Sequence, residues 1–259
     1  MKKILVFLLL CTLLSGLALP ALAAKADPLL TLVNPWHTLP EGWKVELVSI
    51  GNGHRVDKTC YDDLIAMLSA CRAAGLQPVV RSSYRNQTTQ KQLYENKVRQ
   101  WKGYGYSDAE ARKRAATIVA LPGTSEHQMG WAVDIVDATY RTLDEKQATT
   151  STQKWLIEHS WEYGFILRYP VNKSDITGII YEPWHYRYVG KDYARQIYKS
   201  GLCLEEWLEY AAKKEAIRTA ITDRYSELAR TILQVLRGQE QLGTVVDLTT
   251  PLLQSVMNP

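Results

Sequence analysis

An aspartate inside an otherwise apolar run is the feature that most constrains how this sequence can fold. The run is Trp131-Ala132-Val133-Asp134-Ile135-Val136, and its continuous apolar and β-branched residues predict a strand in the protein core. A carboxylate buried in such a strand is costly unless it is paired, hydrogen-bonded or bound to a metal. The strand follows a loop rich in turn and polar residues, Leu121 to Gln128. We therefore expect the fold to bring a polar partner to Asp134.

Four further segments have the pattern of strands, and five have the pattern of helices. The predicted strands are residues 43–50, 78–80, 165–169 and 186–189. The predicted helices are residues 61–74, 88–101, 107–119, 152–163 and about 203–237, with Gly75 and Gly164 closing two of them. Because helices and strands are mixed without regular βαβ alternation, we predict an α+β fold with a mainly antiparallel sheet and surrounding helices.

The first 23 residues have the pattern of a secretory signal peptide. A basic Met-Lys-Lys start precedes an apolar stretch from Ile4 to Leu19, and Ala21-Leu22-Ala23 supplies small residues at the spacing that signal peptidase reads. The alternative is a retained membrane anchor, but polar and turn residues interrupt the run before it reaches the roughly 20 residues that a span needs. We therefore predict cleavage near Ala23 and a secreted, extracytoplasmic protein.

Size and charge fit one folded domain with appendages. With 259 residues, 46% of them hydrophobic, the chain can bury a full core. We predict one domain over residues 28–210, followed by a helical extension and tail over residues 211–259. Loss of Lys2 and Lys3 with the signal peptide lowers the formal charge from +4 to +2. Since so small a charge does not steer a protein strongly to nucleic acid, we expect no nucleic-acid partner, and a monomer is the default.

Three cysteines remain after the signal peptide: Cys60, Cys71 and Cys203. An odd number allows at most one intramolecular disulfide. If Cys60 and Cys71 share one helix, eleven positions separate them by about 16 Å, which is beyond disulfide reach. Any bridge therefore uses Cys203. Because none of the three has the C-x-x-C spacing of a thiolate zinc site, we interpret them as core residues rather than metal ligands.

Two short clusters carry the chemistry of the sequence. Ser125-Glu126-His127 lies a few residues before Asp134, and Glu182-Pro183-Trp184-His185 follows about fifty residues later. Two imidazoles and one carboxylate are a sufficient protein shell for a catalytic zinc ion with an open fourth position. A lone histidine in a loop is more often a solvated side chain, and this applies to the remaining histidines, His37, His54 and His159. The joint pattern predicts one Zn²⁺ held by His127, Asp134 and His185, with Glu182 as the base that takes a proton from water.

The sequence resembles a known family over these clusters and beyond them. From about Leu30 to about Tyr210 it is similar to the VanY-type D-alanyl-D-alanine carboxypeptidases of peptidase family M15, subfamily B. The similar segments are SSYRNQTTQ, PGTSEHQMGWAVDIVD, GFILRYP and EPWHYRYVG. The resemblance implies a hedgehog/DD-peptidase-like fold. It also implies that S-x-H-x(6)-D supplies two zinc ligands, His127 and Asp134, and that E-x-x-H supplies the base Glu182 and the third ligand His185.

The resemblance assigns further residues to the substrate. It implies that Arg85 approaches the scissile carbonyl and the substrate carboxylate, where a planar fork of donors suits an oxyanion. Gln90 and Ser125 are implied as further contacts to the C-terminal D-residue, although a helix-cap or surface hydrogen bond is the alternative for both. Four further residues are expected to line the pocket or to hold the ligating imidazoles in place by hydrogen bonds: Tyr84, Trp184, Tyr186 and Arg187. The sequence departs from the family pattern at Ser83 and at Trp131, and a bulky Trp131 is expected to narrow the pocket or change which peptide is accepted.

The resemblance implies zinc-dependent hydrolysis of the terminal D-Ala-D-Ala bond of peptidoglycan stem peptides, with release of D-alanine. Two alternatives stay open on the same scaffold: an L,D-carboxypeptidase acting on tetrapeptides and a D,D-dipeptidase acting on free D-Ala-D-Ala. A noncatalytic cell-wall-binding module with a structural metal is a third reading. The open three-ligand shell and Glu182 argue against it, because structural zinc sites usually close with a fourth protein ligand.

Overall fold

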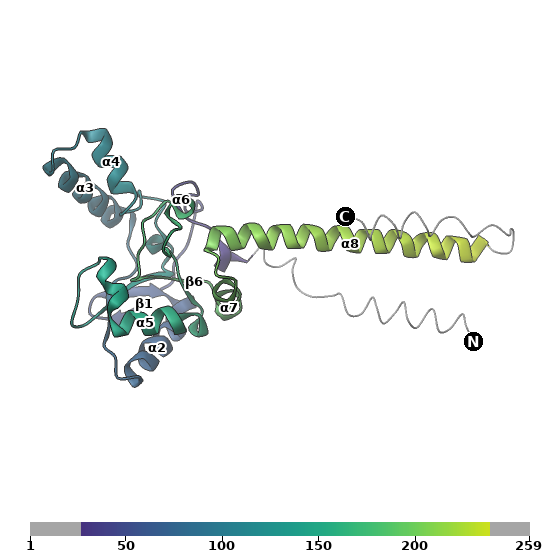
Figure 1. Ribbon diagram of the computed structural model, residues 1–259, viewed down its shortest axis with the longest axis horizontal. Helices are drawn as coiled ribbons and strands as arrows, with labels where there is room; N and C mark the ends of the chain where they lie inside the picture. The colour runs from purple at the N-terminus through teal and green to yellow at the C-terminus, as the bar shows by residue number, and fades with distance from the viewer. Residues whose placement is uncertain (1–26, 239–259) are drawn as a thin grey trace. The chain divides into compact units, whose positions relative to one another are not determined.

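A computed structural model describes residues 27–238 (Figure 1). The predicted signal peptide, residues 1–23, and the tail beyond residue 238 lie outside the described residues. The chain divides between Tyr210 and Ala211 into two compact units, and the first of them holds both β-sheets. Within residues 27–238, no helix is long and apolar enough to cross a membrane.

A four-stranded antiparallel sheet forms the centre of the first unit. Its strand order is β3-β4-β6-β5, and each neighbouring pair is antiparallel, so the predicted antiparallel α+β fold is confirmed. The strands are β3 (Pro78–Ser82), β4 (Ala132–Asp137), β5 (Phe165–Leu167) and β6 (His185–Tyr188). All six residues of β4 are buried, as expected for the apolar run. The register places Asp134 between Ser82 of β3 and His185 of β6.

A hairpin of β1 (Leu47–Gly51) and β2 (His54–Asp57) forms the second sheet. Its turn uses positive φ angles at Asn52 and Gly53. The sequence predicted only the first of these strands, because β2 is four residues long and contains three polar residues. The side chain of Asp57 then accepts a hydrogen bond from the Thr59 backbone N–H at 2.9 Å and caps the following helix. That helix therefore begins at Lys58, three residues earlier than predicted.

The α-helices lie between the strands and after them along the chain. They are α2 (Lys58–Ala73), α3 (Gln87–Gly103), α4 (Asp108–Ala116), α5 (Ser151–His159), α6 (Ser174–Thr177), α7 (Lys191–Ser200) and α8 (Leu204–Gly238). Short 3₁₀ helices are η1 (Pro28–Leu30), η2 (Glu126–Met129), η3 (Glu145–Thr149) and η4 (Ser160–Tyr163). The helix predicted over residues 152–163 is thus α5 followed by η4, and it closes at Gly164 with φ 82° as expected. The sequence analysis missed α7.

The main core lies on one face of the four-stranded sheet, under α2 and α5 (Figure 1). Because side chains alternate along a strand, Val133 and Ile135 of β4 and Tyr186 of β6 join this core, while Asp134 and His185 belong to the opposite set. Further core residues are Val56, Leu64, Met67, Leu68, Leu156 and Phe165. The apolar residues of the strands thus anchor the sheet, and their polar neighbours form the site.

The three described cysteines are free and buried. Cys60 and Cys71 lie in the core beneath the sheet, and Cys203 precedes α8. The sequence analysis had assigned any disulfide to Cys203, but no bridge joins these three residues. Their interpretation as core residues is confirmed by their burial.

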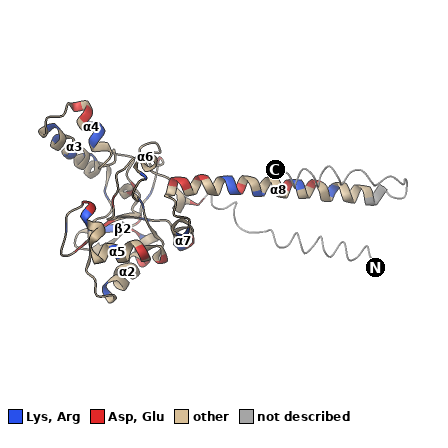
Figure 2. Ribbon diagram, viewed as in Figure 1, with Lys and Arg blue, Asp and Glu red and all other residues tan. Residues whose placement is uncertain are grey.

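Helices α3 and α4 pack on each other around a small core of their own, formed by Tyr94, Val98, Ala111 and Ala115. Both helices contain residues of both charge signs, as α8 also does (Figure 2). Arg112 illustrates the pattern, because it pairs with Asp108 at 2.8 Å and with Glu95 at 3.0 Å. Leu93 and Lys97 of α3, together with residues 118–120 after α4, line part of the pocket described below.

Candidate metal centre

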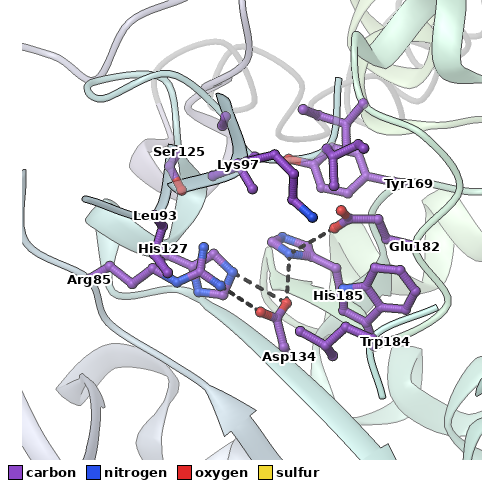
Figure 3. Close-up of a pocket in the computed structure, with 15 residues that line it drawn as sticks. Arg85, Leu93, Lys97, Ser125, His127, Asp134, Tyr169, Glu182, Trp184 and His185 are labelled. Carbon is purple, nitrogen blue, oxygen red and sulfur yellow. Dashed lines mark hydrogen bonds and ion pairs between the residues drawn. The ribbon is translucent and has the colours of Figure 1, made fainter. Parts of the chain in front are cut away.

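Three buried side chains converge from η2, β4 and β6 (Figure 3). Asp134 Oδ1 lies 3.3 Å from His127 Nε2 and 3.1 Å from His185 Nδ1. Their three candidate ligand atoms all lie within 4.8 Å of one another. The three residues are 2–3% exposed. Sequence reasoning predicted this set, and the structure brings all three together.

The backbone explains how His127 reaches the start of β4. Helix η2 ends at Met129, and the next residue, Gly130, has a φ of 80° that reverses the chain so that β4 begins at Ala132. A Cβ atom at this position would lie 2.6 Å from Val45 Cγ1 and 3.0 Å from Asp57 Cβ. Only glycine combines the left-handed conformation with so close an approach. This turn directs His127 back toward Asp134.

Both imidazoles have a partner on the side away from Asp134. His127 Nδ1 lies 2.8 Å from the carbonyl oxygen of Ser83, so Nδ1–H donates and Nε2 keeps its lone pair. His185 Nε2 lies 3.4 Å from Glu126 Oε2, which leaves Nδ1 facing Asp134. Burial, followed by Arg85, lowers the pKa of His127 to about 4 and keeps its imidazole neutral. A neutral imidazole is the form that binds a metal.

The donor set fits zinc. Two imidazole nitrogens and one carboxylate oxygen form a three-residue shell, and the same atoms face a cavity where water or substrate can enter. The second oxygen of Asp134 accepts a hydrogen bond from Arg85 Nη2 at 2.7 Å, which fixes the carboxylate. Burial lowers the pKa of His185, but the hydrogen bonds that its imidazole makes to Asp134 and Glu126 outweigh this and raise the pKa to about 9. A metal ion bound to His185 would therefore displace a proton.

Glu182 lies beside the three residues without joining their cluster. A tight turn places it, because the His185 backbone N–H donates to the Glu182 carbonyl oxygen at 3.2 Å. Its carboxylate oxygen Oε2 is 3.8 Å from His185 Nδ1. Burial raises the pKa of this carboxyl to about 8; Asp134 adds to the rise, and His185 and Arg85 oppose it. A carboxyl with such a pKa can both take and return a proton near neutral pH.

The cavity over this cluster has a volume of about 250 Å³. That is below the roughly 300–1,000 Å³ of pockets for drug-sized ligands, and it suits the end of a peptide rather than its whole length. Its apolar wall consists of Leu93, Ile118, Val119, Leu143 and Ile179. Lys97 of α3 and Tyr169 also line it, and sequence reasoning missed both (Figure 3). Lys97 follows Leu93 by one helical turn, a spacing that places both residues on one face of α3.

Of the three residues predicted to contact the substrate, two line the cavity and one lies behind it. Arg85 and Ser125 line the cavity. Gln90 is fully buried and lies outside the lining, where its Nε2 donates to the carbonyl oxygen of Ala120 at 2.8 Å and its Oε1 accepts from Arg85 Nη1 at 3.4 Å. Gln90 therefore supports Arg85 from behind.

The residues predicted to form the pocket wall or to support the ligands also lie in different places. Trp184 lines the cavity, whereas Tyr186 lies in the core and donates its hydroxyl to Gln153 Oε1 at 2.8 Å. Arg187 is fully buried against Glu126. The expectation that Trp131 narrows the pocket is wrong, because Trp131 lies outside the lining. It packs edge-on against Trp43, with ring centroids 4.9 Å apart.

Comparisons with known proteins agree with this arrangement. The profile of the family described as VanY, D-alanyl-D-alanine carboxypeptidase, matches residues 53–191. A D-alanyl-D-alanine carboxypeptidase of Enterococcus faecalis is 46% identical over 180 residues, which cover 69% of this chain and 65% of that protein. The putative carboxypeptidase YodJ of Bacillus subtilis is 35% identical over 198 residues, covering 72% of this chain and 69% of that protein.

A solved structure of VanYB in complex with D-alanine-D-alanine has a TM-score of 0.65 and 43% identity, covering 71% of this chain and 98% of that one. A mutant of the vancomycin resistance D,D-pentapeptidase VanY, in complex with Zn(II), has a TM-score of 0.64 and 44% identity, with coverage of 69% and 98%. The shared sequence includes both clusters that build the metal centre. The chain therefore belongs to the VanY D-alanyl-D-alanine carboxypeptidase family.

Proposed function

We propose that this protein is a zinc-dependent carboxypeptidase that releases D-alanine from peptidoglycan stem peptides ending in D-Ala-D-Ala. The observation that carries the proposal is the convergence of His127, Asp134 and His185 in a cavity with Glu182 beside them. The family match supports it, and so do the relatives named for D-Ala-D-Ala substrates and for a zinc complex.

In this proposal His127 Nε2, His185 Nδ1 and one oxygen of Asp134 hold one zinc ion. When bound, zinc supplies a Lewis acid that activates water and polarises the scissile carbonyl. The three residues contribute a fixed geometry, because each has a second partner: Ser83 for His127, Arg85 for Asp134 and Glu126 for His185.

Glu182 moves the proton. Its carboxylate accepts a proton from the attacking water as the water oxygen bonds to the carbonyl carbon of the penultimate D-alanine. It then passes this proton to the nitrogen of the terminal D-alanine as the C–N bond breaks. The products are a shortened peptide with a new carboxyl group and free D-alanine, and Glu182 returns to its ionised form.

Arg85 and Ser125 orient the substrate. Arg85 extends along the cavity wall with one guanidinium nitrogen on Asp134, and its remaining N–H groups can meet the negative charge that develops on the carbonyl oxygen or the terminal carboxylate. Ser125 offers a hydroxyl from the residue just before η2. Gln90 acts one step behind, because it holds Arg85.

The place of action follows from the substrate and from the first residues of the chain. Peptidoglycan lies outside the cytoplasmic membrane, and the basic and apolar start of the sequence is typical of a signal peptide. We infer an extracytoplasmic enzyme, cleaved near Ala23, with a carboxypeptidase domain over residues 28–210. Residues 211–259 are its helical extension and tail.

A substrate panel tests the proposal. The mature protein is loaded with zinc and given a stem pentapeptide ending in D-Ala-D-Ala, the tetrapeptide that lacks the last D-alanine, and free D-Ala-D-Ala. We expect the fastest D-alanine release from the pentapeptide. Preferred cleavage of the tetrapeptide would identify an L,D-carboxypeptidase instead, and preferred cleavage of the free dipeptide would identify a D,D-dipeptidase.

A further inference from the structure

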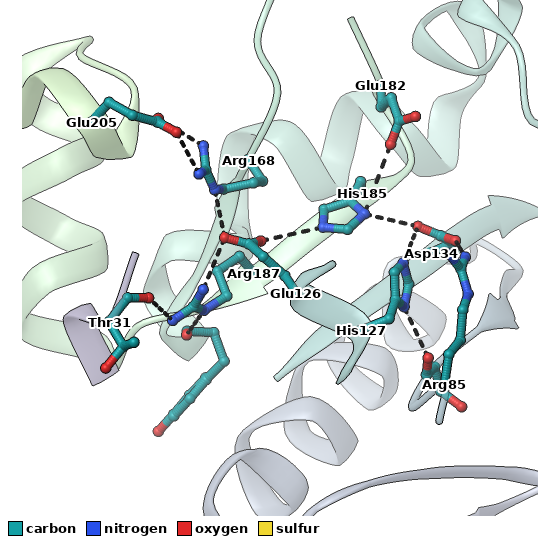
Figure 4. Close-up of polar contacts among 12 residues, drawn as sticks. Thr31, Arg85, Glu126, His127, Asp134, Arg168, Glu182, His185, Arg187 and Glu205 are labelled. Carbon is teal, nitrogen blue, oxygen red and sulfur yellow. Dashed lines mark hydrogen bonds and ion pairs between the residues drawn. The ribbon is translucent and has the colours of Figure 1, made fainter. Parts of the chain in front are cut away.

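A buried glutamate lies behind the metal ligand His185. The side chain of Glu126 has no exposed surface, and its Oε2 lies 3.4 Å from His185 Nε2 (Figure 4). This contact is on the opposite side of the imidazole from Asp134. Glu126 stands next to the ligand His127 in sequence, yet its carboxylate serves the other histidine. The mechanism above uses Glu126 only as the outer partner of His185.

Two buried arginines hold the other oxygen of Glu126. Arg168 Nε donates to Glu126 Oε1 at 2.7 Å, and Arg187 Nη1 donates to the same oxygen at 2.8 Å. Both arginines are fully buried. Both guanidinium groups thus contact one oxygen of the Glu126 carboxylate, and its other oxygen, Oε2, faces His185.

Each arginine also contacts residues outside the two sequence clusters that contain the predicted metal ligands. Arg168 makes a two-pronged contact with Glu205 in the first turn of α8, at 2.8 and 2.6 Å. Arg187 donates to the carbonyl oxygens of Leu29 and Thr31 at 3.1 and 3.0 Å (Figure 4). A continuous chain of charged groups thus runs from His185 to Glu205. Both of its outer anchors lie outside residues 53–191, the part that the family profile matches.

We propose that Glu126 is a positioning residue that holds His185 with a proton on Nε2 and a lone pair on Nδ1 toward the metal, and that Arg168, Arg187 and Glu205 fix Glu126 in place. An imidazole whose outer nitrogen donates to a carboxylate is a stronger and better oriented ligand. The zinc affinity of this site therefore depends on Glu205, a residue of α8. The inference rests on the proposed zinc site but not on the identity of the peptide substrate.

The competing account is a buried ion cluster that only stabilises the fold. Under that account, changes in the cluster lower the melting temperature and leave zinc affinity as it was. The experiment therefore measures both quantities in the full mature chain: zinc affinity by competition with a chromophoric chelator, and thermal unfolding of the metal-free protein.

Glu126→Gln is the direct variant, since it keeps the shape and removes the charge. Outer partners of metal-bound histidines typically contribute about 10–100-fold in metal affinity, and we expect a loss of zinc affinity in that range. Glu205→Gln changes the residue at the other end of this series of charged contacts, farthest from His185. It also serves as the test if Glu126→Gln does not fold. We expect it to weaken zinc binding by a smaller factor.

Glu206→Gln is the matched control. Glu206 is the next residue of α8 and has its own partner, Lys173 Nζ at 2.7 Å, outside the chain that leads to His185. We expect it to leave zinc affinity unchanged. A second readout is the ¹⁵N NMR spectrum of His185 in the zinc-loaded wild type, where we expect the proton on Nε2.

Unchanged zinc affinity in Glu126→Gln or Glu205→Gln, with a lowered melting temperature, would overturn the inference in favour of the structural account. A proton on Nδ1 of His185 in the zinc-loaded protein would overturn it as well. A third outcome is that the wild type binds zinc, that Glu126→Gln binds it more weakly, and that the wild type releases no D-alanine from any peptide. In that case the proposed function fails while this inference stands.

Discussion

Asp134 joins the two halves of the site through its two carboxylate oxygens. Oδ1 faces His127 and His185, and Oδ2 accepts from Arg85. The residue proposed to bind the metal is thus also the residue that holds the arginine proposed to stabilise charge on the substrate. Since a buried carboxylate with fewer partners would be costly, the position of Asp134 in an apolar strand is satisfied only when the whole site assembles.

Glu182→Gln separates metal binding from proton transfer. The amide keeps the size of the side chain but cannot accept the proton of the attacking water, so we expect D-alanine release to fall about 10²–10⁴-fold. Zinc content, measured by mass spectrometry of the native protein, should stay at one ion, because Glu182 lies outside the ligand cluster. Glu158→Gln, at a side chain 71% exposed on α5, is the control and should behave as wild type. Wild-type turnover in Glu182→Gln would exclude Glu182 as the base.

The sequence could predict the residues whose chemistry is visible in a motif. His127, Asp134, Glu182 and His185 stood out because their types and spacing match a metal site. The role of Glu126 could not be predicted in this way, although the residue belongs to the same motif. Its partners Arg168 and Arg187 are 42 and 61 residues away along the chain. Contacts at such separations are set by the register of the sheet and by α8, and no local pattern carries them.

At the scale of elements, the short connection from η2 to β4 decides where His127 points. The continuous apolar run predicted β4, the polar loop before it was recognised, and the structure adds the turn at Gly130 between them. The hairpin strand β2 and the helix α7 were missed. The reason for β2 is that four largely polar residues leave too short a pattern, and its pairing with β1 is a tertiary contact.

Gly130→Ala tests this connection. Alanine at φ 80° is strained, and its Cβ would also clash with Val45 and Asp57, so we expect a loss of unfolding free energy of at least about 1–3 kcal/mol and weaker zinc binding. Gly75→Ala is the matched control: its φ is also 80°, but nothing lies within 4 Å of the added Cβ. Chemical denaturation of both variants measures the difference. Equal destabilisation by the two substitutions would contradict the role given to close packing at Gly130.

At the scale of the whole molecule, the described residues that line the pocket and the charged residues that support His185 all precede Ala211 in the sequence. The lining ends at His185 and the supporting chain ends at Glu205 in the first turn of α8. The sequence analysis predicted a domain over residues 28–210 followed by a helical extension, and the two compact units of the structure divide between Tyr210 and Ala211. The extension beyond it contributes no residue to the described pocket lining.

Truncation tests this division. A mature chain that ends at Tyr210 retains Glu205 and Trp207, and we expect it to bind zinc and to release D-alanine at the wild-type rate. A chain that ends at Cys203 loses Glu205, the partner of Arg168, and should bind zinc more weakly. Loss of activity in the chain that ends at Tyr210, with normal folding by circular dichroism, would show that the extension takes part in catalysis.

The free thiols report on the integrity of the whole fold. Burial raises the pKa of Cys60 to about 12 and that of Cys71 and Cys203 to about 11, so at pH 8 all three are protonated as well as shielded. We expect a disulfide reagent such as Ellman's reagent to find no reactive thiol in the native mature protein and three in denaturant. Fewer than three thiols in denaturant without reductant would reveal a disulfide and contradict the structure.

The most direct test of the zinc carboxypeptidase account is D-alanine release from a stem pentapeptide before and after removal of the metal. The mature protein is assayed as purified, after dialysis against a chelator, and after zinc is added back. The account predicts release that the chelator abolishes and stoichiometric zinc restores. Release that persists in protein shown to be free of metal, or no release from any D-Ala-terminated peptide despite one bound zinc ion, would contradict it.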